Sequence, residues 1–305
     1  MRSLQYTIIL TMIFLLTAEG IAFSNDGPSG QLKVSFSDQA KPGELRVSQG
    51  SGDITVIGYS GKEIIIESDS VVQTPRENHD NERARGLRKI SGSQVLVNSW
   101  EDENIIDISS SIDNDSNMTI HVPTQTSLKL GGMIMEGDIT VTGVTGDFEI
   151  NTLDGDIVLT GISGTVVAHS VDGDITVSLD SVDPQKPMSF STVDGDIDVT
   201  LPGDIEANVH MKNIDGDIFT DFEIELVNYP VEVKNRKSKS TGNAKQRSWN
   251  NPSSPHTVIQ DMITGNILTD IIMSAVGNNL YGSINGGGPE IQFITIDGDI
   301  FLRKK

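Results

Sequence analysis

The amino-acid sequence predicts an all-β protein that folds as a single flattened β-solenoid, with coils of roughly 18–22 residues. Glycines recur nine residues apart, without a gap, at Gly137, Gly146, Gly155, Gly164 and Gly173. A short fixed period of this kind is typical of solenoid proteins. The composition agrees with short strands and tight turns, because the chain has 30 glycines and only 5% aromatic residues.

Two nine-residue units make one coil. The stretch "LDGDIVLTGISGTVVAHSVDGDITV", residues 153–177, has the full Asp-Gly-Asp form at Gly155 and Gly173 and a weaker form between them at Gly164. The sequence therefore predicts an 18-residue coil with one strand on each side of a thin core. Spacings of 22 residues to Gly195 and a further 21 to Gly216 follow, and we expect the extra residues to form loops on the flank of the stack.

Side-chain alternation predicts which residues face the core. Leu153, Ile157 and Leu159 lie on one side of a strand, whereas Asp154 and Asp156 lie on the other. The apolar residues are therefore expected to point inward and both aspartates to point outward.

An odd period also requires a corner in every unit. Strict alternation over nine residues would move the apolar side chains to the other face in the next unit, so one residue must reset the phase. Gly143 and Gly161, or Thr152 and Ser170, are the expected corners.

The N-terminal segment predicts export. Arg2 precedes an apolar run at residues 6–16, and the small residues Gly20 and Ala22 suit signal-peptidase cleavage after Ala22. The protein is therefore expected to be periplasmic, attached to the cell surface or secreted. The alternative is an uncleaved N-terminal anchor, for which the apolar run is short. The predicted organisation is a signal peptide over 1–22 and a solenoid domain over 23–305, with first coils at 31–130, a regular stack at 131–228, a mobile insertion at 229–260 and closing strands at 261–305.

Charge and cysteine content exclude several functional classes. The chain has no cysteine, which excludes disulfides, a thiolate nucleophile and Cys-ligated metal sites. Its net charge is −21, with 20 acidic and two basic residues between positions 133 and 225, and such a surface repels nucleic acid. The opposite charge gathers at residues 234–247, "KNRKSKSTGNAKQR", which is typical of a solvated loop, with a basic docking segment as the alternative.

The repeats resemble a known family. The stretch "GDITVTGVTGDFEINTLDGDIVLTGISGTVVAHSVDGDITVSL", the preceding "MTIHVPTQTSLKLGG" and the terminal "GSINGGGPEIQFITIDGDIFLRKK" are similar to the bacterial DUF4097 family of β-strand-repeat proteins, described as candidate adhesins. The resemblance covers about residues 40–305, apart from 71–90 and 229–260. It implies an exported or membrane-tethered β-solenoid without established catalytic residues. The chain departs from the family pattern at "GGMIMEGD" and in having Asp where Asn often precedes the glycine.

The repeated aspartates are the first candidates for chemistry, because carboxylate oxygens suit Ca²⁺ and calcium-binding nonapeptide rolls also stack 18-residue coils. Those rolls use Gly-Gly-x-Gly-x-Asp, however, whereas here a single glycine separates two acids. We therefore expect turn residues, in which Asp bonds its own backbone and Gly takes a strained conformation, with weak divalent-cation association as the alternative. The pairs are Asp154 and Asp156, Asp172 and Asp174, Asp194 and Asp196, Asp215 and Asp217, and Asp297 and Asp299.

No other motif predicts a catalytic, cofactor or metal site. The stretch from Asp113 begins like an EF-hand loop, but Met118 replaces the required glycine and Thr124 the bidentate Glu. The five histidines, at positions 79, 121, 169, 210 and 256, are scattered and accompany no hydrolase motif.

The predicted function is that of a non-enzymatic exported scaffold, adhesin-like, which binds an envelope protein or glycan through its β-face. A motif copied in nearly every coil is better explained by the coil than by a reaction centre. The alternative is a β-helical polysaccharide lyase or hydrolase that uses outward carboxylates such as Asp196 and Asp198. Such an enzyme needs a nearby Arg or Lys, and residues 133–225 offer only Lys186 and Lys212.

Overall fold

The computed structural model describes residues 31–68, 72–73, 95–96, 101–102, 104–109, 117–131, 136–226 and 277–305. These residues form strands and turns and no helix, which confirms the predicted all-β class. The predicted signal peptide and the predicted insertion at 229–260 lie outside the described residues. The strands are β1 (Gln31–Ser35), β2 (Gly43–Ser48), β3 (Ile54–Tyr59), β4 (Glu63–Ser68), β5 (Val72–Gln73), β6 (Val95–Leu96), β7 (Glu101–Asp102), β8 (Ile105–Ser109), β9 (Met118–Pro123), β10 (Thr126–Leu130), β11 (Ile139–Thr142), β12 (Thr145–Asn151), β13 (Ile157–His169), β14 (Ile175–Val182), β15 (Met188–Ser191), β16 (Ile197–Leu201), β17 (Ala207–Asn213), β18 (Ile218–Thr220), β19 (Glu225–Leu226), β20 (Asn278–Ile284), β21 (Glu290–Ile294) and β22 (Ile300–Lys304).

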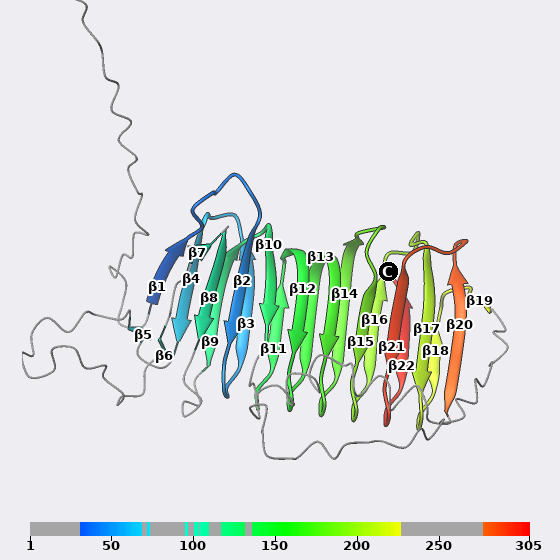
Figure 1. Ribbon diagram of the computed structural model, residues 1–305. Helices are drawn as coiled ribbons and strands as arrows, with labels where there is room; N and C mark the ends of the chain where they lie inside the picture. The colour runs from blue at the N-terminus through cyan, green and yellow to red at the C-terminus, as the bar shows by residue number, and fades with distance from the viewer. Residues whose placement is uncertain are drawn as a thin grey trace, which may run out of the picture.

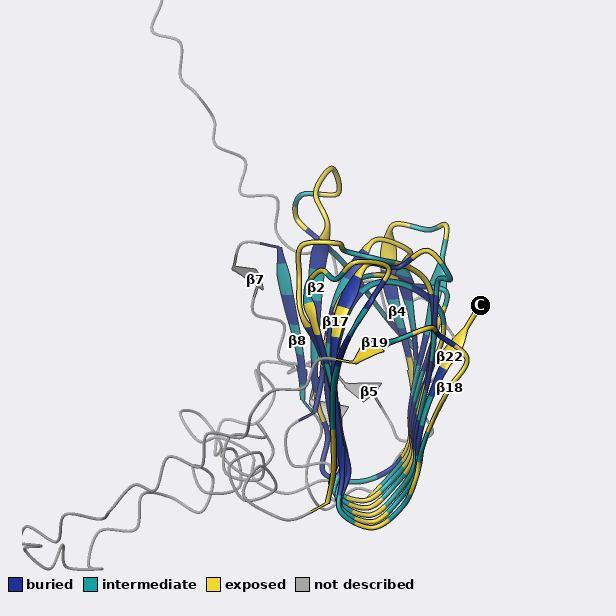
Figure 2. Cartoon of the chain, turned by 90° about the vertical axis from the view of Figure 1, so that its right-hand side faces the viewer, coloured by how far each residue is buried: buried dark blue, intermediate teal, exposed yellow. Residues whose placement is uncertain are grey.

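The strands form two facing rows, and in the central part of the stack, from β9 to β18, the chain passes back and forth between the two rows (Figures 1 and 2). Row one has the order β1-β4-β9-β3-β11-β13-β14-β16-β22-β18. Row two runs from β8 through β2-β10-β12-β13-β15-β21-β17 to β20. Strand β13 belongs to both, because its first residues pair in row one and its last residues in row two. One strand from each row makes a rung, and the rungs stack along the long axis.

The register of the central rungs follows the sequence period. Ile139 pairs with Ile157, and Ile157 with Ile175, so each step is 18 residues; the next step, to Ile197, is 22. All four side chains are fully buried between the rows. The predicted alternation is therefore confirmed for this layer. Each such isoleucine contributes about 1.5–3 kcal/mol relative to an exposed one.

Both predicted kinds of corner are present. Gly143 and Gly161 have positive φ of 68° and 60°, and the pairing of β13 with β14 shifts register beside Gly161. Thr152 and Ser170 lie between the end of a row-two strand and the next Asp-Gly-Asp turn, and both are buried. Each rung thus turns twice. At these corners the inward and outward alternation of side chains starts again, so that apolar residues face the core in the next strand as well.

The order of the rungs in space differs from their order in sequence. The C-terminal rung, β21 and β22, lies between the rung of β15 and β16 and the rung of β17 and β18. Phe293 on β21 stacks on Phe190 of β15, with ring centroids 5.3 Å apart, inside the core. The Gly298 turn therefore lies between the Gly195 and Gly216 turns, which are neighbours in the sequence of repeats but not in space.

The N-terminal part repeats this arrangement. The rung of β2 and β3 lies between the rung of β8 and β9 and the rung of β10 and β11. Antiparallel strands flank three ends of the rows: β4 and β1 beside β9, β7 and β6 beside β8, and β20 beside β17. Such strands cover the ladder of backbone groups that an edge would otherwise expose. Within the described part of the chain, no helix has the length and apolar character needed to cross a membrane.

Candidate functional site

The Asp-Gly-Asp turns lie side by side along one edge of the stack, which we call the aspartate edge, seen as the aligned turns at the bottom of Figure 2. Backbone hydrogen bonds connect each turn to the next. Gly155 N–H donates to the carbonyl of Asp172 at 2.9 Å, and Ile157 N–H to that of Asp174 at 2.8 Å. The glycines of the edge, in spatial order, are Gly52, Gly137, Gly155, Gly173, Gly195, Gly298 and Gly216.

Glycine is required at these turns for two reasons. Gly155 has φ of +144°, a conformation that other residues rarely adopt. A Cβ atom at this position would also lie 2.2 Å from the carbonyl oxygen of Gly137 in the neighbouring turn. The predicted strained glycine is confirmed, and the close stacking of backbone on backbone adds a second constraint.

Except at Asp217, in the last turn of the edge, the second aspartate of each Asp-Gly-Asp turn accepts a hydrogen bond from the neighbouring turn. Asp156 Oδ1 accepts the backbone N–H of Asp174 at 2.8 Å, and Asp174 Oδ1 accepts that of Asp196 at 2.8 Å. The same bond recurs along the whole edge at 2.7–3.1 Å, with acceptors at Asn117, Asp53, Asp138, Asp156, Asp174, Asp196 and Asp299. The expectation that Asp bonds its own backbone is therefore wrong, because the acceptor is used between rungs.

The first aspartate of each turn points into water. Asp154 pairs through its backbone with Asp172, and Asp172 with Asp194, yet their carboxylates are exposed and make no hydrogen bond or ion pair with the described residues. Neighbouring carboxylates at the roughly 4.8 Å strand spacing repel by only about 1 kcal/mol in water. Among the described residues there is also no group of three or more acidic or histidine side chains placed to hold a metal ion.

A buried hydroxyl layer lies behind the glycines. Thr192 Oγ1 donates to the carbonyl of Gly173 at 3.0 Å, and Thr295 Oγ1 donates to that of Gly195 at 3.1 Å. Ser170 makes the equivalent, longer bond to Gly155 at 3.3 Å. The edge is therefore bonded from both sides, by carboxylates on the solvent side and hydroxyls on the core side.

The described histidines do not form a catalytic group. His210, on β17, is buried, bonds Asn279 Oδ1 through Nε2 at 2.9 Å and stacks on Tyr281 at 4.1 Å between centroids. His169 Nδ1 lies 2.5 Å from Ser191 Oγ on the neighbouring strand. Burial lowers the pKa of both imidazoles. His121 packs edge-on against Tyr59, and positions 79 and 256 lie outside the described residues.

The C-terminal rung places Arg303 beside Asp198, which with Asp196 is one of the two carboxylates that the alternative function, a polysaccharide lyase or hydrolase, would use. Arg303 Nε lies 2.8 and 2.9 Å from the two carboxylate oxygens of Asp198, because β22 pairs with β16. Asp196 accepts the backbone N–H of Asp299 at 2.7 Å. Sequence reasoning missed Arg303, since nothing in the order of the repeats indicates that the last rung lies inside the stack.

The outer side of row one carries a regular row of hydroxyl groups, and we call it the threonine face. Thr142, Thr160, Ser178 and Thr200 are register partners on four consecutive strands, β11, β13, β14 and β16. Two residues earlier on the same face, Val158 lies between Thr140 and Thr176, so that layer is not a continuous row of hydroxyl groups.

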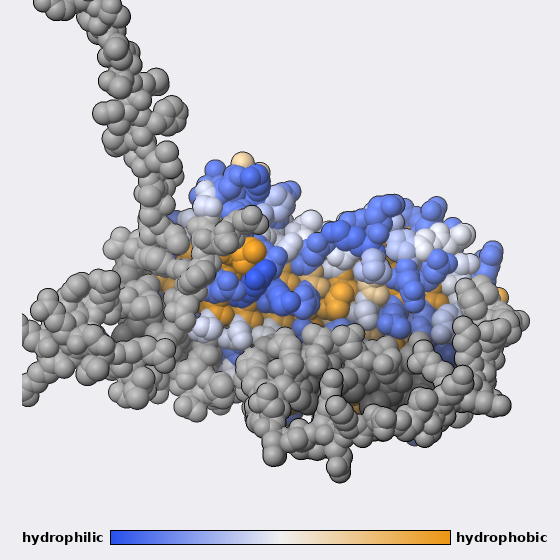
Figure 3. All heavy atoms as spheres, viewed as in Figure 1, coloured by the Kyte–Doolittle hydropathy of each residue, from blue (hydrophilic) through white to orange (hydrophobic). Residues whose placement is uncertain are grey.

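Two cations of row two, Arg46 and Lys129, form ion pairs. Arg46 lies 2.6 Å from Glu44, and Lys129 lies 2.7 Å from Glu149. These four residues line a shallow hollow of about 480 Å³ on the outer side of β2, β10 and β12. Figure 3, which views row two, shows hydrophilic residues concentrated along the upper edge, opposite the aspartate edge.

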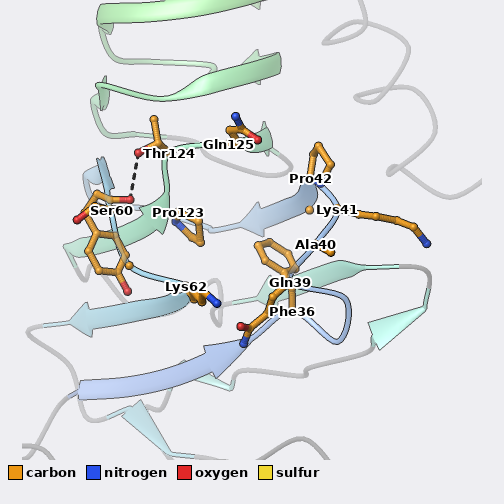
Figure 4. Close-up of a pocket in the computed structure, with 13 residues that line it drawn as sticks. Phe36, Gln39, Ala40, Lys41, Pro42, Ser60, Lys62, Pro123, Thr124 and Gln125 are labelled. Carbon is orange, nitrogen blue, oxygen red and sulfur yellow. Dashed lines mark hydrogen bonds between the residues drawn. The ribbon is translucent and has the colours of Figure 1, made fainter.

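A smaller pocket of about 250 Å³ lies at this upper edge, where three segments meet (Figure 4). It is lined by the loop between β1 and β2, the turn between β3 and β4, and the turn between β9 and β10. Lys41 and Lys62 are among its lining residues, and none of the described lining residues is Asp or Glu. Sequence reasoning missed this pocket, because its walls come from three separate parts of the chain.

Comparisons with known proteins give a family and a remote structural likeness. The family model described as Toastrack DUF4097 matches residues 21–249. No curated protein matches the chain. A crystal structure from Clostridium sporogenes ATCC 15579, described as a candidate cell adhesion protein, aligns with 91% of this chain and 100% of its own, at 11% identity and a TM-score of 0.31. A likeness of this size carries no argument about function.

Proposed function

Because the chain belongs to the Toastrack DUF4097 family, whose model matches residues 21–249, we propose that it is an exported, non-enzymatic scaffold with an adhesin-like role. In this proposal the stacked rungs form a flattened β-solenoid. The scaffold binds an envelope protein or glycan through one outer β-face, and it does not bind nucleic acid, which its net charge of −21 repels.

The observation that supports this function best is the threonine face. Thr142, Thr160, Ser178 and Thr200 repeat one kind of polar, uncharged contact at the strand spacing of about 4.8 Å. A regular array of this kind suits a partner that is itself extended or repetitive, because each rung then adds the same weak contact. A reaction centre, in contrast, needs one asymmetric group of residues.

The test is co-sedimentation of the chain from Phe23 to Lys305 with isolated bacterial envelopes and with purified envelope polysaccharides. Thr160 is exposed at the centre of the threonine face, and Ser189 lies on the outer side of row two. We expect Thr160→Arg to abolish sedimentation and the matched Ser189→Arg to leave it intact. Equal sedimentation of both variants, or none by the unaltered chain, would contradict the proposal.

A polysaccharide lyase or hydrolase is the second candidate, and the Asp198–Arg303 pair is the observation that favours it. Arg303 contacts both oxygens of Asp198, however, and Asp196 is bonded to the backbone of Asp299, so neither carboxylate is free to act as a base. We expect no new reducing ends and no unsaturated products when the chain is incubated with acidic polysaccharides. Product formation that Asp198→Asn abolishes would establish the enzyme.

A further inference from the structure

We propose that the pocket at the upper edge, which we call the Lys62 pocket, binds a hexuronate unit of an acidic polysaccharide. This site is separate from the threonine face. It recognises its ligand through the carboxylate group that the ligand carries. The proposal depends on the charge of the pocket, the shape of its apolar floor and the way its walls are held.

Among the described residues that line the pocket, the only charged side chains are those of two lysines. Lys41 is committed to Asp38, with its Nζ 3.0 Å from a carboxylate oxygen, and in Figure 4 its side chain extends away from the other labelled residues. Lys62 is exposed and forms no ion pair or hydrogen bond with the described residues, and Figure 4 shows it beside Gln39 and Phe36. The pocket therefore offers one free ammonium group, which suits one carboxylate.

The negative aspartate edge does not cancel this charge. Strand β3 runs from Ile54, next to that edge, to Tyr59 at the pocket, and six residues in a strand span about 20 Å. Physiological salt screens exposed charges over about 8 Å. An anionic ligand can thus reach Lys62 without entering the field of the aspartates, even though the whole chain carries a charge of −21.

The remaining lining suits a sugar ring better than a bare phosphate. Phe36, which is 5% exposed, forms an apolar floor with Pro42 and Pro123. The side-chain amides of Gln39 and Gln125 are exposed and make no hydrogen bond with described residues, so they can donate to and accept from sugar hydroxyls. A phosphate would be expected to recruit an arginine or several backbone N–H groups. The volume of about 250 Å³ lies below the range of drug-sized sites and fits a single small unit.

The walls are fixed before any ligand binds. Asn104, buried below the loop between β1 and β2, accepts the N–H of Asp38 at 3.0 Å and donates to the carbonyls of Asp38, Lys41 and Pro42 at 3.1–3.3 Å. On the other side, Thr124 Oγ1 donates to the carbonyl of Tyr59 at 3.1 Å, drawn as the dashed line in Figure 4. A pocket with walls held in this way loses little conformational freedom on binding.

The hollow on the outer side of row two differs from the Lys62 pocket, because its cations are already ion-paired. Its cations, Arg46 and Lys129, each have an acidic partner within 2.7 Å, so an incoming carboxylate would have to displace one. Lys62 has no such competitor among the described residues. Of the two hollows, the Lys62 pocket is the one with an unsatisfied positive charge.

The experiment is isothermal titration of the chain from Phe23 to Lys305 with an oligogalacturonate and with the corresponding neutral galactan oligosaccharide. We expect the uronate to bind more tightly than the neutral sugar, and less tightly as NaCl is added. Lys62→Met should weaken uronate binding about tenfold, the effect of losing one charge-assisted hydrogen bond. Lys129→Met, which removes a paired lysine on row two, should leave it unchanged.

Other outcomes would overturn the proposal. Equal affinity for the charged and neutral sugars, no binding of either, or uronate binding that survives Lys62→Met would each contradict it. Thermal melting of Lys62→Met serves as the folding control, and because Lys62 is exposed and unpaired, its melting temperature should match that of the unaltered chain. Thr160→Arg separates this site from the threonine face, since that variant should lose envelope binding and keep uronate binding.

Discussion

The two aspartates of each Asp-Gly-Asp turn have different roles at the scale of single residues. Asp156 accepts the backbone N–H of Asp174 in the next rung, whereas Asp154, two residues earlier, makes no side-chain hydrogen bond with the described residues. The two side chains have the same chemistry and are both exposed. Substituting each of them in turn therefore measures how much the hydrogen bond between rungs contributes to the free energy of unfolding.

We predict that Asp156→Ala lowers the free energy of unfolding by about 1 kcal/mol, the usual net value of one hydrogen bond. Asp154→Ala should leave it unchanged or raise it slightly, because it removes one of a row of like charges. Urea denaturation of the two variants checks this. Equal destabilisation by both would mean that the carboxylates act through charge alone.

Much of this residue-scale detail could be predicted from the sequence, because it follows from the local pattern. The positive φ of Gly155 and the exposure of Asp154 and Asp156 follow from an Asp-Gly-Asp turn before an alternating strand. The acceptor role of Asp156 could not be predicted, since its partner belongs to another rung. That partner is 18 residues away for Asp156 but 103 residues away for Asp196.

At the scale of elements, the insertion of the last rung between earlier ones makes the C-terminus part of the core. Strand β21 has β15 on one side and β17 on the other, and β22 lies likewise between β16 and β18. The sequence could not predict this order. Ile197 pairs with Ile300 in the same register that Ile157 uses with Ile175, so the repeats do not encode which copy is the neighbour.

We predict that deletion of residues 288–305 unfolds the end of the stack and does not simply shorten it. The deletion removes the partners of four strands at once and exposes Phe190, which stacks on Phe293 in the core. Hydrogen exchange should show lost protection throughout Ala207–Asn213 and Met188–Ser191. Deletion of β1, which pairs only with β4, should remove protection near β4 alone. Continued protection of β17 after the C-terminal deletion would contradict the rung order.

Strand β17 of row two contains a histidine that makes stability depend on pH. His210 on β17 bonds Asn279 on β20 through Nε2, and its Nδ1 lies 3.3 Å from Gln292 Nε2. Asn279 accepts and Gln292 donates, which requires the neutral ring. Burial lowers the pKa of His210 in the folded protein, so the unfolded chain binds a proton first as the pH falls.

The stability contributed by neutral His210 should therefore be complete above the unfolded pKa of about 6.5 and be lost as the pH falls from there towards the folded value. We predict that His210→Gln reduces the loss of unfolding free energy between about pH 7.5 and about pH 5.5, relative to the unaltered chain. His121→Gln is the matched control, since His121 lies on β9 with no hydrogen bond to the described residues. If both variants lose stability as the unaltered chain does, His210 does not carry the dependence.

At the scale of the whole molecule, the negative charge of the aspartates and the proposed uronate site lie at opposite edges of the stack. The aspartate edge gathers exposed carboxylates, while the Lys62 pocket lies at the other end of β3. The repeat predicts the first, because every unit contributes the same residues. It cannot predict the second, since Phe36, Lys62 and Gln125 come from segments that only the irregular N-terminal rung order brings together.

We expect the repeated aspartates to stabilise the stack without chelating a cation. Asp156, Asp174, Asp196 and Asp299 already accept backbone hydrogen bonds, and the described residues offer no cluster that could hold a metal ion. If this is right, calcium can stabilise the folded chain only by screening its negative charge, and screening does not distinguish one ion from another except by valence. A chelating site would instead add about 2.7 kcal/mol at a hundred times its dissociation constant.

The most direct test is a thermal melt of the chain from Phe23 to Lys305 in EDTA, in millimolar CaCl₂, and in NaCl at matched ionic strength. We predict that the melting temperature in CaCl₂ matches that in NaCl, and that Asp154→Asn and Asp156→Asn do not change the difference between the two salts. A melting temperature in CaCl₂ several degrees above the NaCl sample, lost in Asp154→Asn, would contradict the account and identify the aspartate edge as a calcium site.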